Sequence, residues 1–229
     1  VQLEATEEKV ITLDAPGSST DGIAQARLVA ATKVGDLAAM QAALAEGASA
    51  SAADARGIQP LHWACAHGDL AIAQWLHGAG ATLDATDANG ATPMHQACAN
   101  GHRAIAVWLH SAGAPVDAAS IGGLTPLHAA CSNGHCAVAQ WLHGAGATLD
   151  ATDAKGATPM HQACANGHRA IAVWLHSAGA SVDAANIDGL TPLHAACSKG
   201  HYAIAQWLYG VGAPLEATDH YASTPLHRA

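Results

Sequence analysis

The chain has 229 residues, of which 50% are hydrophobic and 12% are charged, and it contains no phenylalanine. This length suggests one or two domains with enough chain for a core. The formal net charge is −9 with only nine Lys and Arg residues, which are scattered. Nucleic acids and anionic membranes both require clustered basic residues, so neither is an expected partner. Membrane insertion is not expected either, because no apolar run approaches the ~20 residues of a membrane helix.

Residues 1–20 precede the regular part of the chain, and we interpret them as an N-terminal extension. The stretch KVITLDAP at 9–16 is consistent with an extended segment packing on the first helices, and PGSST at 16–20 is typical of a turn or linker. The basic and apolar regions of a signal peptide are not recognisable here. The sequence starts with Val1, which leaves open a targeting segment removed before that residue.

From residue 21 onward the sequence repeats every 33 residues, with the same residue types returning at the same register. The recurring histidines are His62, His95, His128, His161, His194 and His227. The recurring tryptophans and cysteines are Trp75, Trp108, Trp141, Trp174 and Trp207, and Cys65, Cys98, Cys131, Cys164 and Cys197. The period predicts one repeat domain, residues 21–229, with units 21–53, 54–86, 87–119, 120–152, 153–185 and 186–218 and a partial unit 219–229.

The unit 120–152 predicts a turn and a first short helix. A glycine marks the turn, because its backbone tolerates positive φ. Thr125 offers a hydroxyl for capping, and Pro126 follows at the first helical position, where a missing N–H costs nothing. These signals predict a helix over 126–132.

A second helix is predicted over 136–144 in the same unit. Its apolar side chains, including Trp141, fall on one stripe at helical spacing. A unit this small cannot bury that stripe alone, so the units must stack into one continuous core. We expect the tryptophan to fill the gap between stacked helix pairs, with its N–H reaching a loop carbonyl.

The motif that carries this period is TPMHQAC at 92–98 and 158–164, TPLHAAC at 125–131 and 191–197, and a Gly-His pair that follows each. It resembles the ankyrin repeat over roughly residues 21–229. The resemblance implies an all-α solenoid with short β-hairpin or turn tips, two antiparallel helices per repeat, and a curved array that binds partners through its concave face. The first unit lacks the TPLH stretch and looks like an N-terminal cap. The last unit stops inside its first helix.

Sixteen histidines and six cysteines raise the possibility of a metal or haem site. His95, Cys98 and His102 have the spacing i, i+3, i+7, which could form a ligand face on one helix. However, a closed zinc site requires four ligands, and a cysteine also packs well as a small buried apolar residue. By resemblance, the first histidine ties the turn to the helix start. We therefore expect no metal and no cofactor.

The sequence favours neither a disulfide between the cysteines nor an active site. Equivalent cysteines in stacked units are separated by about 8–10 Å, beyond the ~7 Å Cα limit of a disulfide. Free thiols favour an intracellular reducing compartment, first of all the cytoplasm. We find no nucleophile elbow, P-loop or dinucleotide fingerprint, and no catalytic group that breaks the repeat symmetry. The chain is therefore expected not to be an enzyme.

By resemblance, partner contacts come from the tips and first helices of the array. In this sequence those positions are Arg56, Ile58, Trp63, Asn89, Gln96, Asn100, Ile121, Leu124, Asn133, Lys155, Gln162, Asn166, Ile187, Asp188, Leu190, Lys199 and Tyr221. Trp63 stands out, because its counterparts are glutamine or alanine. It is either a binding hot spot or a residue packed under the segment 1–20.

We therefore predict a non-catalytic adaptor or scaffold that binds a protein partner. The low fraction of charged residues favours a stably bound subunit of a larger assembly, because a free solenoid normally protects its long surface with charged side chains. The alternative is a regulatory or targeting segment of an enzyme whose catalytic domain lies outside this chain.

Overall fold

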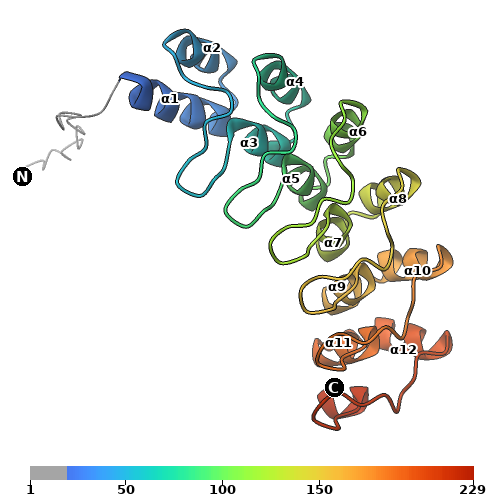
Figure 1. Cartoon of the computed structure of the whole chain (residues 1–229). Helices are drawn as coiled ribbons and strands as arrows, with labels where there is room; N and C mark the ends of the chain where they lie inside the picture. Colours follow the sequence, from blue (N-terminus) through green and yellow to red (C-terminus); the bar gives the residue numbers. More distant parts are fainter. Residues whose placement is uncertain (1–19) are drawn as a thin grey trace, which may run out of the picture.

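The computed structural model describes residues 20–229, in which the chain forms twelve α-helices and a final short 3₁₀ turn, without β-strands (Figure 1). The elements are α1 (Thr20–Val34), α2 (Leu37–Ala45), α3 (Pro60–His67), α4 (Leu70–Gly78), α5 (Pro93–Ala99), α6 (Arg103–Ser111), α7 (Pro126–Ser132), α8 (Cys136–Gly144), α9 (Pro159–Ala165), α10 (Arg169–Ser177), α11 (Pro192–Ser198), α12 (Tyr202–Gly210) and η1 (Pro225–Arg228). The all-α prediction is confirmed, and α7 and α8 have the predicted bounds. The predicted packing of the segment 1–20 falls on residues outside the described part.

The helices stack as antiparallel pairs into a curved array (Figure 1). The odd-numbered helices form one continuous row, in which α3 contacts α5, α5 contacts α7, and so on to α11 and η1. The even-numbered helices form a second row on the outer side of the curve, and the loops between repeats project along its inner side. The predicted tips are turns, so the inner side is formed by these turns and the adjacent first helices.

In the five repeats between residues 54 and 218, one buried histidine fixes each turn to the next repeat. In α7, His128 accepts the backbone N–H of Thr125 at its Nδ1 (3.1 Å), while the Thr125 hydroxyl caps the N–H of His128. Because Nδ1 is an acceptor, Nε2 carries the proton and donates to the carbonyl of Ala157, 29 residues further on (3.0 Å). The structural role inferred for this histidine is therefore visible in its hydrogen bonds.

In the four repeats between residues 87 and 218, a second histidine links each repeat to the one before it. His135, which precedes α8, places Nε2 3.0 Å from the carbonyl of Ala99 in the preceding repeat. Its ring lies directly against Gly101, where an added Cβ would stand 2.6 Å from Nδ1 of His135. A side chain at this glycine would therefore displace the ring, and glycine is required both for this close approach and for the local φ of +79°.

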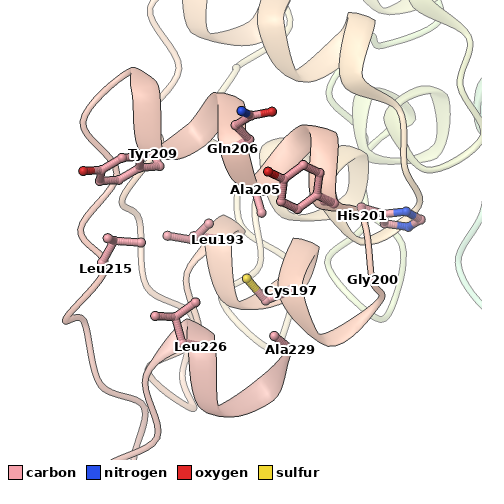
Figure 2. A pocket seen from close by; sticks show the side chains of 11 residues that line it. Leu193, Cys197, Gly200, His201, Ala205, Gln206, Tyr209, Leu215, Leu226 and Ala229 are labelled. Atoms are coloured by element: carbon pink, nitrogen blue, oxygen red, sulfur yellow. The ribbon is translucent and has the colours of Figure 1, made fainter.

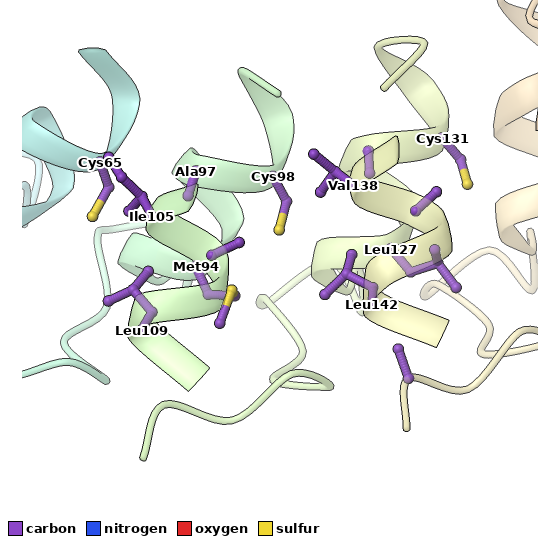
Figure 3. Close-up of a cluster of buried hydrophobic side chains, with 14 of the residues drawn as sticks. Cys65, Met94, Ala97, Cys98, Ile105, Leu109, Leu127, Cys131, Val138 and Leu142 are labelled. Carbon is purple, nitrogen blue, oxygen red and sulfur yellow. The ribbon is translucent and has the colours of Figure 1, made fainter. Parts of the chain in front are cut away.

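The core is a single cluster of apolar side chains that runs through the six complete repeats, and Figure 3 shows part of it around Cys98 and Leu127. Leu, Met, Ile and Ala residues fill it, and the cysteines of α3, α5, α7 and α9 are fully buried among them. Burial raises the pKa of Cys98 to about 12, as it does for Cys164. These thiols therefore remain protonated and pack as small hydrophobes.

The tryptophans occupy the margin of this core and differ from the prediction in one respect. Trp141 is half-buried and packs against the core, but among residues 20–229 no loop carbonyl accepts its indole N–H. Instead it lies edge-on to His110 of the preceding repeat, with ring centroids 6.0 Å apart and planes at 71°. The same contact joins His77 to Trp108, His143 to Trp174 and His176 to Trp207.

Candidate functional site

Each tip on the inner side of the curve is a tight turn closed by one acceptor side chain. In the third repeat, Asp87 Oδ1 accepts the N–H groups of Asn89 (2.8 Å) and Ala91 (2.9 Å). The equivalent acceptors in other repeats are Asp54, Asp153, Asn186 and Asp219. Ser120 closes the remaining turn through its Oγ. The backbone of each tip is fixed in this way, while the side chain at its apex is free to differ.

Hydrogen bonds also join the tips to one another in a row along the inner side. The backbone N–H of Ile121 donates to the carbonyl of Asn89 at 2.9 Å, and Ile187 donates to Lys155 in the same way. Gly90 makes this approach possible, because an added Cβ there would lie 2.7 Å from the nitrogen of Ile121. The tips therefore form one preorganised edge.

The tip residues predicted as partner contacts lie along this edge. Its exposed members are Arg56, Asn89, Ile121, Leu124, Lys155, Ile187, Asp188 and Tyr221, and its half-buried members are Ile58 and Leu190. Ile121 is 78% exposed and Ile187 is 59% exposed, whereas the repeats before and between them carry Ala88 and Ala154 at the same position. Large apolar side chains thus reach solvent in every second repeat of this stretch.

The other predicted contacts lie on or beside the first helices. Trp63, Gln96 and Gln162 are half-buried on their helices. The exposed residues that follow the helices are Asn100, Asn133, Asn166 and Lys199. The amides of the three asparagines donate to the carbonyl four residues earlier, so these side chains also close the helix ends.

Trp63 occupies a position at which the four following repeats carry glutamine or alanine. Lys33 of α1 places its Nζ 4.8 Å from the centroid of the Trp63 ring, and the Arg56 guanidinium lies 6.0 Å away. Both distances are within the range of a cation–π contact. The indole N–H is buried, and among residues 20–229 it has no acceptor. Packing of Trp63 under the segment 1–20 concerns residues outside the described part.

The histidines that suggested a metal site hydrogen-bond to backbone groups of the repeats. His95 accepts the N–H of Thr92 at Nδ1 and contacts the carbonyl of Leu124 through Nε2. His102 contacts the carbonyl of Ala66. In residues 20–229, no three His, Cys, Asp or Glu side chains gather as metal ligands would. Over the same stretch, no helix is both long and apolar enough to span a bilayer.

Family models for ankyrin repeats match most of this array. The model for many repeat copies matches residues 28–77, 61–110 and 170–209, and the model for three copies matches residues 108–186. The chain belongs to the ankyrin-repeat family. No curated protein matches it over its length or in part. Ankyrin repeats are modules of protein–protein interaction and are typically non-catalytic, so the exposed inner edge is the candidate site of this ankyrin-repeat chain.

Two features of the array escaped sequence reasoning. Lys33 belongs to the first unit, which departs from the motif, so the period did not connect it with Trp63. The three tyrosines of the chain also passed unnoticed as a group, although all lie after residue 201 and all are exposed. Their positions in the last repeat and the last tip are the one signal that could have drawn attention to that end of the array.

Proposed function

We propose that this ankyrin-repeat chain is a non-catalytic adaptor or scaffold that holds a protein partner along its inner side. One observation carries the proposal: the turn backbone is the same in every tip, while the exposed side chains at the apices differ. Loops that are held by a rigid scaffold and differ in their side chains are where binding residues are most often found. A rigid backbone also lowers the entropic cost of binding, because little has to be ordered on contact.

The exposed isoleucines indicate what kind of partner surface would fit. Ile121 and Ile187 present apolar side chains two repeats apart, separated by the polar apex of Lys155. Exposed apolar residues rimmed by polar ones are typical of protein-binding surfaces. We infer an elongated partner with apolar contacts that match this two-repeat spacing.

Trp63 is the proposed hot spot of the surface. Tryptophan and arginine are enriched among residues that dominate binding energy, and here Arg56 and Lys33 flank the indole. The two cations favour an acidic side chain on the partner at this place. The low fraction of charged residues supports a stably bound state, because a surface with few charged side chains is better tolerated when it is covered.

The test begins with crosslinking mass spectrometry on native material, which identifies the partner and the repeats it contacts. The identified partner is then titrated against Trp63→Gln, Ile121→Ala and Ile187→Ala. Each substitution installs a residue that other repeats of this chain already carry at the same position, so the fold should tolerate it. We expect a loss of about tenfold or more for Trp63→Gln.

The matched control is Val107→Gln on the outer helix α6, which installs the residue of the equivalent Gln140. Val107 is exposed on the outer row, and its replacement should leave affinity unchanged. Crosslinks confined to the outer helices, or full affinity in all three inner-side variants, would disprove the proposed surface.

A further inference from the structure

Four interfaces of the array hold a histidine ring against a glycine of the preceding repeat. His102 lies on Gly68, where an added Cβ would stand 2.6 Å from the ring, and its Nε2 donates to the carbonyl of Ala66 at 3.0 Å. The same arrangement joins His135 to Gly101, His168 to Gly134 and His201 to Gly167. In each of these interfaces the ring therefore fills the space beside the glycine and provides a donor for a backbone carbonyl.

The interface between the first two repeats has the glycine but not the ring. Asp69 stands where the other repeats carry the histidine, and its Oδ1 accepts the N–H of Ile72 (3.0 Å) at the start of α4. Beside Gly35, the glycine of this interface, an added Cβ would meet only Cδ1 of Ile72 among the described residues, at 4.0 Å. Over the same residues 20–229, no side chain donates to the carbonyl of Lys33, which corresponds to the acceptor carbonyl of the other interfaces.

A cleft of about 220 Å³ lies at the position that the ring fills in the other interfaces. Its lining includes Thr32, Val34 and Gly35 of the first repeat and His67, Asp69 and Ile72 of the second. The cleft therefore lies between two complete repeats. The apolar groove beside Leu193, Tyr209 and Leu226 differs in this respect, because the unit next to it stops inside its first helix (Figure 2).

The size and the rim of the cleft favour a single side chain of a protein as its occupant. Sites for small molecules usually enclose about 300–1,000 Å³, and this cleft is smaller. Val34 on its rim is 78% exposed, whereas the five following repeats carry a polar residue at that position. Exposed apolar residues beside polar groups are typical of protein-binding surfaces. Two departures from the repeat, Asp69 and Val34, thus meet at one place.

We propose that this cleft is a docking site for a histidine side chain of a partner protein, in which an apolar residue adjoins the histidine. The imidazole lies on Gly35 and its Nε2 donates to the carbonyl of Lys33, as the chain's own histidines do elsewhere. The adjoining apolar side chain packs on Val34, and the carboxylate of Asp69 disfavours an acidic occupant. The helix α3 separates the cleft from the tip at 54–59, so this site goes beyond the partner-binding edge proposed above.

The probe for this site is the peptide acetyl-Ala-His-Val-amide, titrated into the isotope-labelled full chain at pH 8 and followed by NMR. At this pH the imidazole is mostly neutral, because its usual pKa is about 6.5. We expect saturable shifts at the amides of Gly35, Asp36 and Leu70. The matched control peptide carries a methyl group on Nε2 of its histidine, which removes the donor, and it should bind about threefold or more weakly. Free imidazole should bind at least about tenfold more weakly than the peptide, because it makes no apolar contact with Val34.

Two variants at one position test the cleft from the protein side. Asp69→His installs the ring that the four other interfaces carry, so it should fill the cleft, abolish the peptide shifts and raise the urea midpoint. The four equivalent histidines show that the fold accommodates this residue. Asp69→Asn retains a side-chain acceptor for the N–H of Ile72 and leaves the cleft open, so it should retain the peptide.

Several results would overturn the proposal. The methylated peptide could bind as well as the unmodified one, Asp69→His could still bind the peptide, or no probe could bind at all. Free imidazole could bind as tightly as the peptide, which would make the cleft a site for a small ligand. Sedimentation could show self-association that Asp69→His abolishes, which would make a second copy the occupant. None of these results involves the tips, so this proposal and the proposed function can fail separately.

Discussion

The buried histidine His128 offers the sharpest test of how one repeat holds the next. The substitution His128→Ala removes the acceptor of the Thr125 N–H and the donor to the Ala157 carbonyl. The imidazole is 1% exposed, so both backbone groups would lose a partner in a buried place. Each buried polar group left without a partner costs about 1–3 kcal/mol. We therefore expect the free energy of unfolding to fall by about 2–6 kcal/mol.

The matched control is His227→Ala in the last, partial unit. His227 accepts the N–H of Thr224 at 3.1 Å, just as His128 does for Thr125. It is exposed, however, and among residues 20–229 its Nε2 has no carbonyl partner. The loss should therefore stay below about 1 kcal/mol, as for an ordinary exposed hydrogen bond.

Urea denaturation followed by circular dichroism measures both variants. A third variant, His128→Asn, retains a short acceptor for the Thr125 N–H but cannot reach Ala157, so its loss should be intermediate. If His128→Ala were no less stable than His227→Ala, the link between repeats would contribute nothing, and the reasoning would be refuted.

Three further predictions concern pH, packing and backbone strain. Burial lowers the pKa of His62, His95, His128 and His161. The stability that comes from keeping these imidazoles neutral is therefore complete above about pH 6.5 and is lost as the pH falls below that value, by at most about 1.4 kcal/mol per pH unit for each histidine. A urea midpoint that did not change between pH 7.5 and 5.5 would contradict this prediction. Trp141→Ala should cost about 2–3 kcal/mol, less than the ~3–5 kcal/mol of a fully buried aromatic, because Trp141 is half-buried; a thermal melt without any loss would rule out its packing role. Ala222 has a φ of +57° at a position where the other tips carry glycine. The substitution Ala222→Gly should therefore relieve about 1 kcal/mol of backbone strain and slow hydrogen exchange at the Ser223 amide. Faster exchange at that amide would argue against strain at Ala222.

Much of the fold follows from short-range signals that the sequence states directly. Thr125 and Pro126 start α7 where predicted, because capping and the fixed φ of proline act within one turn of the chain. The bounds of α8 follow from its apolar stripe in the same way. The period then extends these assignments from one unit to the others.

The sequence predicted which positions of the repeat carry the candidate contacts, but not how far each side chain is exposed. The repeat shows that Ile121 and Ile187 share a position, but their exposure depends on how tightly each tip packs on the next. Trp63 stood out by residue type alone. Its neighbour Lys33 comes from α1, 30 residues earlier, and only stacking brings the two together.

The sequence by itself determined the repeat, its helices and the histidine at each helix start, because these depend on residues within one turn of each other. Tertiary structure alone decided that His128 reaches a carbonyl 29 residues away and that Trp108, Trp141, Trp174 and Trp207 each meet a histidine of the preceding repeat. Those outcomes depend on the distance and rotation between neighbouring units. A period fixes what recurs along the chain, whereas the packing of one unit on the next decides which side chains it covers.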